Sequence, residues 1–577
     1  TSALVPSSHA TDSLTPLLDT IVELDADHVF AHCRVGLDND CFIRDHVLSG
    51  PVSHEGSGLH GLACVPFMVS LEIMAEACAL LAGRLEVRVI ENVKAFDWIA
   101  LNEGALTLDV HAEVLDRERG HFAARIVTPR GMAVSAEFGF ESDWRLQGVA
   151  PLKEHRPWGI DVPNMYTPGR YAMFHGPVFQ SMREIAGWDD TGIDVHLSPV
   201  GLTGFFAEGH RPQLILNPVL LDALGQVVPC WLVQYVGPEF HSFPSTIGRI
   251  ELYEACPADR EGVVMRARQQ PLNPAETDIA APRLWQFECT DGDGRVLLRG
   301  GDMVNLFFRV TPSYHAARTY PLGGWLGAPV DLAIDDQTLL WQVPLMPEEL
   351  CQQSGGICLR VLAHAVLDES ERVQWRSLEG PLRRRREWLY GRAALKEAVR
   401  HWVQAQTGHL LYPSDIVVGH DAYGAPWVDG WWGDQLVAPP RVSLSHDAAH
   451  CVVAVSPSDS PVGVDFEALA NERRPELLAD ALAPSEQSLI EGRSGSDLDE
   501  RLLRLWCAKE AAAKCLGTGL QGQPWAFSIT AADEGCEQLL VEHDVGVVQV
   551  RVFRHEGRIL AAARLAMGQL ETEKSLD

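Results

Sequence analysis

The stretch VPFMVSLEIMAEACALLAG, residues 65–83, predicts a long helix that is buried on nearly every side. Pro66 suits the first turn of a helix and Gly83 suits its C-terminal end. Leu71 and Met74 recur at helical spacing, yet most positions between them and after them are apolar too. Because a helix that is apolar all round belongs in a core, the stretch predicts a domain built around one central helix.

Four short segments with a strand-like pattern follow this helix. They are EVRVIENV (86–93), ALTLDVHAEVL (105–115), FAARIVT (122–128) and AVSAEFGF (133–140). Apolar and polar side chains alternate along them, which is typical of strands with one buried face. We therefore expect one buried helix followed by an antiparallel sheet.

The same order of elements returns in the next part of the chain. A second apolar helix is predicted in LNPVLLDALGQVVPCWLVQY (216–235), where Asn217 can cap the helix and Pro218 can open it. A strand region near 170–200 precedes it, and strand-like runs follow at 247–254, 263–268, 284–290 and 296–309. The repeated order suggests two similar units side by side, although no clear repeat of residues is visible.

A third region of mixed α/β character follows a stretch rich in Pro, Gly and Ala at 313–338, which is typical of a linker. Its predicted elements are a basic helix at 383–403, the apolar run CVVAV (451–455), the strand VGVDFE (462–467), the helix LRLWCAKEAAAKCLG (503–517) and two last strands near 538–566.

Composition limits the classes of function. The 577 residues exceed what one core holds, and 46% hydrophobic with 22% charged residues is ordinary for a soluble globular protein. A net charge of −31 argues against a general binder of nucleic acid or anionic membranes, although RRRR at 383–386 is a local basic patch. The apolar run around 65–82 carries Glu72 and Glu76, so we do not expect it to cross a membrane.

The cysteines indicate a reducing compartment. All 13 are scattered, with no CxxC pair and no Cys/His cluster of zinc spacing, so free thiols in the cytoplasm are expected. The first residue is Thr rather than Met, which suggests that the chain is a piece of a longer one.

Acidic and basic side chains gather on two of the C-terminal elements. Asp465 and Glu467 are two apart on a predicted strand, so they face the same way, and Glu510 would add a third carboxylate. Three oxygen ligands suit Mg²⁺, and Lys514, one turn after Glu510, could reach a phosphate. Taken alone, Glu510 and Lys514 could equally be a solvated ion pair.

Together with SLSH (443–446), which contributes His446, these motifs resemble those of the 4′-phosphopantetheinyl transferase superfamily. The resemblance is to the larger, two-lobed type that activates surfactin synthetase and similar peptide and polyketide synthetases. Its signatures (V/I)G(V/I)D-x-E and W-x-x-K-E-x-x-x-K stand in full at 462–467 and 506–514, and RREWLYGRAALK (385–396) also matches. The resemblance covers roughly 339–570.

This resemblance implies a set of ligands for coenzyme A and its metal. Asp465, Glu467 and Glu510 would bind Mg²⁺ on the pyrophosphate. Basic side chains would contact the phosphates, with Lys509, Lys514 and His446 near the pyrophosphate and Arg385, Arg386 and Arg392 near the nucleotide 3′-phosphate.

The implied reaction is attack of a carrier-protein serine on the β-phosphate of coenzyme A. Lys514 would act on the phosphates, and either Glu510 or Glu467 would take the serine proton; the resemblance does not choose between them. One position departs from the family, which often has Gly-Lys-Pro where this chain has Gly424-Ala425-Pro426.

Two N-terminal residues are candidates for acid–base chemistry. His46 stands in RDHVLSG (44–50), and Asp222 lies inside the second apolar helix with Gln226 one turn on. A buried carboxylate is costly unless it is paired or neutral, so we expect Asp222 to have a raised pKa and to serve as a general acid. Taken singly, His46 could instead be structural.

With FHGPVFQSMREI (174–185), these residues resemble the double hot-dog dehydratase domain of polyketide and polyunsaturated-fatty-acid synthases. The matching motifs are HxxxG at 46–50, GPxFQ at 176–180 and DxxxQ at 222–226, and the resemblance covers roughly 20–312. Two positions depart from it: Pro66 lies 16 residues after Gly50, where five is common, and His175 replaces the usual aromatic residue.

The dehydratase resemblance implies elimination of water from a 3-hydroxyacyl thioester. A neutral His46 would remove the C2 proton, and a protonated Asp222, oriented by Gln226, would protonate the C3 hydroxyl. A hot-dog thioesterase, and a non-catalytic chain-binding or dimerisation scaffold beside an active transferase, are the alternatives.

We therefore expect an α+β protein, in which a double hot-dog dehydratase precedes a pseudo-twofold, two-lobed α/β transferase. The expected layout is a linker (1–20), two hot dogs (21–155 and 156–312), a linker (313–338), the transferase (339–570, with lobes about 339–457 and 458–570) and a tail (571–577).

The expected function is that of a bifunctional fragment of an iterative type I synthase, of the enediyne or polyunsaturated-lipid type. Its partners would be an acyl carrier protein domain, preferably of the same synthase, and an acyl-phosphopantetheine substrate. Neither nucleic acid nor a membrane is expected as a partner, and a homodimer through the dehydratase is left open.

Overall fold

The computed structural model describes most of the chain. The described residues are 15–54, 58–102, 104–141, 146–159, 161–167, 173–198, 201–202, 204–207, 213–237, 240–254, 260–278, 281–332, 334–469 and 475–566. Most of the expected N-terminal linker (1–20) and the whole expected tail (571–577) lie outside them. The chain divides into two compact units, the first comprising 1–50, 60–320 and 353–357, and the second 51–59, 321–352 and 358–577.

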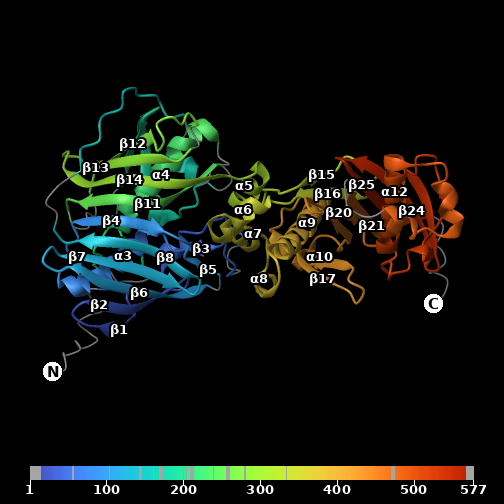
Figure 1. The fold of residues 1–577 in the computed structure, drawn as a ribbon, viewed down its shortest axis with the longest axis horizontal. Coiled ribbons are helices and arrows are strands. Elements are labelled where there is room, and N and C mark those ends of the chain that lie inside the picture. Colours follow the sequence, from blue (N-terminus) through green and yellow to red (C-terminus); the bar gives the residue numbers. More distant parts are fainter. Residues whose placement is uncertain are drawn as a thin grey trace. The chain divides into compact units, whose positions relative to one another are not determined.

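One antiparallel sheet of 12 strands runs through the described part of the first unit (Figure 1). Its first half is β1 (Thr20–Leu24), β2 (His28–Gly36), β6 (Ala105–Asp116), β7 (His121–Thr128), β8 (Gly131–Gly139) and β4 (Val89–Ala95). Its second half is β11 (Phe240–Leu252), β14 (Val296–Arg309), β13 (Arg283–Thr290), β12 (Val264–Pro271), β10 (Gly192–Leu197) and β9 (Met182–Asp189). The halves join where β4 pairs with β11, with Ile90 opposite Ile250.

A long helix packs against each half of this sheet. Helix α3 (Phe67–Ala82) contacts β2, β6, β7 and β8, and helix α4 (Pro218–Val236) contacts β10, β11 and β12. Each half is therefore a hot dog. The two similar units agree with the repeated order of elements, and the double hot dog is the fold that the dehydratase resemblance implies.

The ends of the two helices follow local sequence signals. Pro66 is the N-cap of α3, one position earlier than expected, and Gly83 ends the helix in the left-handed conformation with φ of 67°. At α4, the Asn217 side chain accepts a hydrogen bond from the Leu220 N–H, and Pro218 occupies the first turn.

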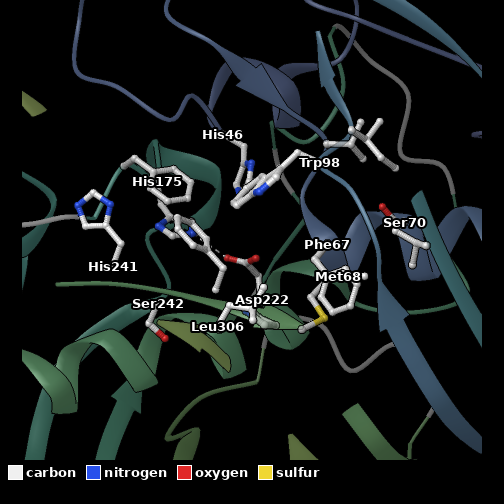
Figure 2. A pocket seen from close by; sticks show the side chains of 18 of the residues that line it. His46, Phe67, Met68, Ser70, Trp98, His175, Asp222, His241, Ser242 and Leu306 are labelled. Carbon is white, nitrogen blue, oxygen red and sulfur yellow. Dashed lines mark ion pairs between the residues drawn. The ribbon is translucent and has the colours of Figure 1, made fainter. Parts of the chain in front are cut away.

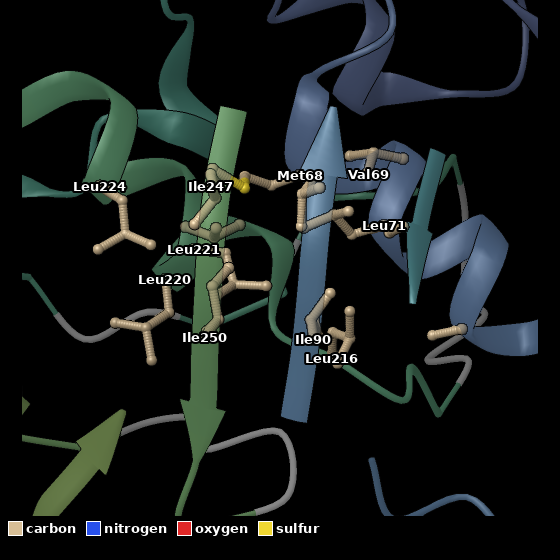
Figure 3. Close-up of a cluster of buried hydrophobic side chains, with 14 of the residues drawn as sticks. Met68, Val69, Leu71, Ile90, Leu216, Leu220, Leu221, Leu224, Ile247 and Ile250 are labelled. Carbon is tan, nitrogen blue, oxygen red and sulfur yellow. The ribbon is translucent and has the colours of Figure 1, made fainter. Parts of the chain in front are cut away.

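The core of this unit is continuous across the junction of its two halves. Figure 3 shows side chains from α3, α4, β4 and β11 packed together. Those that are 1% exposed or less include Met68, Leu71, Ile90, Leu221, Leu224, Ile247 and Ile250. Burial of each such side chain contributes roughly 1.5–3 kcal/mol, so the junction holds the two central helices in fixed positions.

Smaller elements complete the unit, and one of them corrects an expectation. They are α2 (Cys41–Arg44), β3 (Ala63–Cys64), β5 (Ala100–Leu101), η1 (Val162–Tyr166), η2 (Pro177–Phe179) and α5 (Pro312–Thr319). Helix α5 lies where the sequence predicted the start of a linker. Thr311 caps the helix by accepting a hydrogen bond from the Tyr314 N–H, and the Tyr314 side chain is buried. The composition, rich in Pro and Gly, predicted a linker and did not reveal this helix.

The second unit contains two antiparallel sheets, each with one long helix. Strands β15 (Ala328–Pro329), β16 (Leu339–Pro344), β20 (His450–Ser456) and β19 (Arg441–His446) form the first sheet, on which α9 (Leu382–Thr407) packs. Strands β21 (Val462–Ala468), β25 (Arg558–Leu565), β24 (Gly546–His555), β23 (Gln538–His543) and β22 (Ser528–Ala532) form the second, on which α12 (Gly495–Cys515) packs. The unit is thus two-lobed, and β19 lies beside β21 where the lobes meet.

Short elements surround these lobes. They are α6 (Glu348–Gln352), α7 (Ile357–Val366), α8 (Glu369–Ser377), η4 (Pro413–Asp415), β17 (Val417–His420), β18 (Pro426–Asp429), α10 (Trp431–Gln435), α11 (Pro475–Ala479), η5 (Pro484–Leu489) and η6 (Pro524–Ala526). The short helix η3 (Gln353–Gly356) belongs to the first unit. Among the described residues, no helix has the length and apolar character needed to cross a membrane.

The buried carboxylate of Glu72, inside α3, makes the stability of the first unit depend on pH. The Glu72 oxygens accept hydrogen bonds from the Ile215 and Leu216 N–H groups at 2.7 and 2.6 Å. Burial nevertheless raises the pKa of Glu72 from 4.5 to about 8, although those two hydrogen bonds oppose the shift. The folded chain therefore holds a proton there that the unfolded chain releases above pH 4.5.

We expect the free energy of unfolding to fall as pH rises between these two pKa values. The slope from this one group is up to about 1.4 kcal/mol per pH unit, because the native state binds the extra proton. Glu72→Gln should remove that contribution, whereas Glu86→Gln, at a side chain 65% exposed, should not. Denaturant unfolding of both variants from pH 5 to pH 8 checks this; equal slopes for wild type and Glu72→Gln would contradict it.

Candidate active sites

His46 lies two residues after the end of α2, and three contacts with backbone groups fix it. Its backbone forms an antiparallel bridge with His175, and its carbonyl accepts a hydrogen bond from the Cys64 N–H. The ring Nδ1 lies 2.9 Å from the Cys64 carbonyl oxygen. Because a carbonyl can only accept, Nδ1 carries the hydrogen, and Nε2 is left as the basic nitrogen.

Asp222 and Gln226 lie one turn apart on α4, and Gln226 is locked by its partners. Its Nε2 donates to Asp222 Oδ2 at 2.7 Å and to the Phe179 carbonyl at 2.8 Å. The Tyr166 hydroxyl donates to Gln226 Oε1 at 2.7 Å. Every polar atom of the buried Gln226 amide is therefore used to hold Asp222 in place.

The loop that carries His175 is held against the segment that carries His46. The Asp45 carbonyl accepts from the Gly176 N–H, and the Asp45 carboxylate accepts from the Val178 N–H, each at 2.7 Å. A Cβ on Gly176 would lie 2.6 Å from Asp45 Oδ1, so this close approach requires glycine. The glycine of the GPxFQ motif thereby places His175 next to the site.

Figure 2 shows His46, His175 and Asp222 converging in one pocket, with an ion pair between His175 and Asp222. His175 Nε2 lies 3.3 Å from Asp222 Oδ2. One ligand atom from each of the three residues lies within 4.8 Å of the others. The sequence marked His175 only as a departure from a motif, and its part in this cluster was missed.

The pocket is an apolar chamber of about 160 Å³ with its polar groups at one place. Its lining includes aromatic side chains from several elements: Phe67, Phe96, Trp98, Phe174 and Phe243. Such a chamber can hold an apolar chain while a few polar groups act on one point of it.

The two acid–base candidates differ in how the site shifts their pKa values. Burial, together with the charge of His175, lowers the pKa of His46 to about 4, against smaller effects of Asp222 and the Cys64 hydrogen bond. His46 is therefore neutral at pH 7, as a base must be.

The raised pKa that we expected for Asp222 is wrong. Burial raises the pKa of Asp222, but the charge and hydrogen bond of His175, with smaller effects of His46 and Gln226, outweigh it and lower the pKa. Asp222 is thus ionised rather than protonated. The sequence argument counted the burial of this carboxylate and could not count the neighbouring histidine.

In the second unit, a close contact places Asp465 beside α12. A Cβ on Gly463 would lie 2.0 Å from the Ala511 carbonyl oxygen, so only glycine lets β21 approach the helix backbone this closely. Lys514 then donates to Asp465 Oδ1 at 2.8 Å and to the Val464 carbonyl at 2.9 Å. The motif glycine thus joins the two predicted motifs into one site.

The oxygens around Asp465 suit a hard cation. Oδ1 accepts from Ser445 and Lys514, whereas the buried Oδ2 has no hydrogen-bond partner within the described part of the chain. Glu467 shares the strand face of Asp465, and Glu510 acts on the pKa of Lys514, so both carboxylates lie nearby. An all-oxygen donor set with an unpartnered buried carboxylate oxygen fits Mg²⁺. Among the described residues, however, Asp465, Glu467 and Glu510 do not form a set of ligand atoms within 4.8 Å of one another.

Lys509 differs from its expected role as a contact of coenzyme A. Its side chain is 0% exposed, and its Nζ donates to Glu486 Oε2 at 2.6 Å and to the Ala481 carbonyl at 3.1 Å. This lysine holds η5 against α12 inside the lobe. The helical motif does not reveal this, because Glu486 lies 23 residues away in sequence.

A second pocket, of about 290 Å³, lies over α9 and β19. Arg392 and His446, both predicted, line it, and so do Arg384 and His420, which the sequence analysis did not select. Arg384 belongs to the same RRRR run as the predicted Arg385 and Arg386. His420 lies apart from every motif.

The other predicted arginines of α9 have partners within the protein. Arg386 is buried and donates to the Met346 and Ala448 carbonyls at 3.2 and 3.1 Å. The guanidinium of Arg385 lies 4.7 Å from the centre of the Trp375 ring. Neither lines the pocket that Arg392 lines.

Comparison with known proteins identifies part of the second unit. Residues 461–563 match the family model described as the 4′-phosphopantetheinyl transferase superfamily. Asp465, Glu467, Glu510 and Lys514 all lie within the matched residues, whereas Arg392 and His446 lie outside them. The C-terminal region therefore carries a domain of this superfamily. No curated protein sequence matches the chain significantly.

Solved structures similar to about half of the chain include three dehydratase domains. The domain from the CurJ module of curacin polyketide synthase is 14% identical, with 51% of this chain and 98% of that chain covered and a TM-score of 0.39. A domain of a mycocerosic acid synthase-like polyketide synthase is 20% identical, with 52% and 98% covered and a TM-score of 0.36. The domain of PpsC from Mycobacterium tuberculosis is 17% identical, with 51% and 99% covered and a TM-score of 0.38.

The internal ion pair of Lys509 predicts a large effect on stability. Lys509→Met would leave the Glu486 carboxylate buried without its cation, which costs about 3–5 kcal/mol. The double variant Lys509→Met with Glu486→Gln removes both charges and should lose less than the single variant. Denaturant unfolding of the second unit measures both; a loss below about 1 kcal/mol for Lys509→Met would contradict the assignment.

Proposed function

We propose that the first unit eliminates water from 3-hydroxyacyl thioesters carried on phosphopantetheine and forms 2-enoyl thioesters. The observation that carries the proposal is a histidine, neutral at pH 7, beside a histidine–carboxylate pair in an apolar chamber. His46 would take a proton on one side, and the pair on the opposite side would assist the leaving group.

The order of bond changes follows from the acidity of the substrate. The C2 hydrogen of a thioester is the acidic one, and the Nε2 of His46 would accept it. The electron pair that remains forms the C2–C3 double bond, and the C3 hydroxyl leaves as water with a proton from the side of the His175–Asp222 pair. The apolar lining would exclude bulk water, which favours elimination over hydrolysis of the thioester.

Substitution of either side of the chamber should stop the reaction. We expect His46→Ala and Asp222→Asn each to lower kcat for 3-hydroxyacyl-pantetheine by about 100-fold or more, the usual contribution of positioned acid–base groups. Liquid chromatography with mass spectrometry would follow the enoyl product. Glu184→Gln, an exposed residue of β9, is the matched control and should retain full activity.

The same assay separates the alternatives. A free acid and a free thiol as the products would identify a thioesterase. Equal enoyl formation by wild type and both site variants would refute the catalytic roles of His46 and Asp222. No conversion above the uncatalysed rate would leave the first unit as a binding scaffold and refute the proposed elimination.

We propose that the second unit transfers 4′-phosphopantetheine from coenzyme A to a serine of an acyl carrier protein. The superfamily match over 461–563 and the unpartnered Asp465 oxygen support this proposal. Asp465, Glu467 and Glu510 would hold Mg²⁺, which when bound neutralises negative charge on the diphosphate. The carrier would belong to the same iterative synthase, so that the chain primes its own substrate.

The basic side chains would bind the anionic parts of coenzyme A. Burial lowers the pKa of Lys514, but Asp465 and Glu510 outweigh burial and raise the pKa, so Lys514 stays charged at pH 7 and can contact a phosphate. Arg392 and His446 line a pocket whose size and charge suit the nucleotide. Arg385 and Arg386 remain candidates for its 3′-phosphate, and Glu467 or Glu510 for the base that takes the serine proton.

Loading of an apo carrier tests this assignment. With coenzyme A and Mg²⁺, the carrier should gain the mass of one phosphopantetheine, and EDTA should abolish the gain. Glu510→Gln should lower the rate by at least about 100-fold. Asp497→Asn, a 62% exposed carboxylate of the same helix, is the control and should load normally. Full loading by Glu510→Gln would contradict the metal assignment.

A further inference from the structure

We propose that His175 is the proton donor for the leaving hydroxyl, and that Asp222 positions the His175 ring instead of donating the proton itself. The proposal rests on the dehydration proposed above. It assigns the acid of that reaction to a residue at which this chain departs from the usual aromatic side chain.

The hydrogen bonds at Asp222 indicate an ionised carboxylate. Oδ2 lies 2.7 Å from the Gln226 Nε2 and 3.3 Å from the His175 Nε2. The amide nitrogen can only donate, so Oδ2 accepts from it, and an ionised Oδ2 can accept from His175 as well. The His175 Nε2 is therefore placed to direct an N–H at Asp222.

The other nitrogen of His175 has no partner. The His175 side chain is 91% buried. Its Nδ1 is buried too, and within the described residues this atom has no hydrogen-bond partner. His175 lines the chamber, and its ring centre lies 5.5 Å from that of His46. Because Asp222 occupies Nε2, Nδ1 is the nitrogen that remains to donate a proton to a substrate hydroxyl.

The surroundings hold the ring in this orientation. Phe174 stacks on it with ring centres 4.4 Å apart, and the backbone bridge to His46 fixes the loop. The ion pair with Asp222 restrains the opposite edge of the ring. A donor fixed in this way needs no rearrangement at the moment of proton transfer.

The proposed step balances. The C2–H bond breaks and its proton moves to His46 Nε2, while the electron pair of that bond forms the C2–C3 double bond. The C3–O bond breaks with its electron pair on oxygen, which takes the proton from His175 Nδ1 and leaves as water. His46 then returns its proton to His175 through solvent, so no oxidant or reductant is needed.

A substrate with a different leaving group distinguishes proton donation from positioning. Chloride leaves C3 without a proton, so 3-chloroacyl-pantetheine needs the base but not the acid. We expect His175→Phe, which keeps a flat ring against Phe174, to lower kcat for the 3-hydroxyacyl substrate by about 100-fold or more. The same variant should eliminate chloride at nearly the wild-type rate, which also shows that its site is folded.

Three other variants complete the comparison. His46→Ala should lose both reactions, because both need the base. His175→Gln, which can still donate to Asp222 but carries no acidic proton, should behave like His175→Phe. Arg183→Ala, at an exposed residue of β9, should change neither rate.

Each contrary result has a distinct meaning. Undiminished dehydration by His175→Phe, or an equal loss on both substrates, would overturn the assignment of His175 as the donor. Conversion of neither substrate by the wild-type chain would refute the dehydration itself, and the assignment with it. Because two histidines and a carboxylate can also bind a transition metal, stoichiometric metal in the purified wild type that is absent from His175→Phe would overturn it too.

Discussion

The chemistry of the first unit depends on the hydrogen bonds that join Asp45 to the loop carrying His175. Through them, a segment of the first hot dog and a loop of the second lie side by side, with Gly176 at the point of closest approach. His46 enters the chamber from one side of this junction and His175 from the other, while α4 supplies Asp222. Loss of the junction would separate His46 from His175 without disturbing either helix core.

The second unit also depends on a close approach of two segments at a glycine. There, Gly463 lets strand β21 touch the backbone of α12, and the contact places Asp465 beside Lys514. In both units a glycine is required because a backbone must come closer than any side chain allows. The charged groups at each site are partly paired with each other, so a ligand would exchange partners with them and would not have to desolvate isolated charges.

Much of this arrangement can be predicted from sequence because it depends on local pattern. Apolar periodicity predicts helices α3 and α4, and the resemblance of the motifs to a dehydratase implies a double hot dog with His46 and Asp222 in its two halves. The ionisation of Asp222 cannot be predicted in this way, because it depends on His175, 47 residues away and brought near only by the folded loop. The burial of Lys509 against Glu486 cannot be predicted from local sequence either, because the two residues meet only in the folded chain. The same holds for the place of His420 in the pocket over α9.

The most direct test concerns the role of His46 at C2, on which the assignment of the chamber depends. A 2-enoyl-pantetheine thioester would be incubated with the chain in D₂O, and the hydrated product would be examined by mass spectrometry and NMR. If His46 exchanges a proton with C2, the wild-type chain should form 3-hydroxyacyl product with deuterium at C2, and His46→Ala should form almost none. Equal labelling by wild type and His46→Ala, or no labelled product at all, would contradict the proposed elimination chemistry.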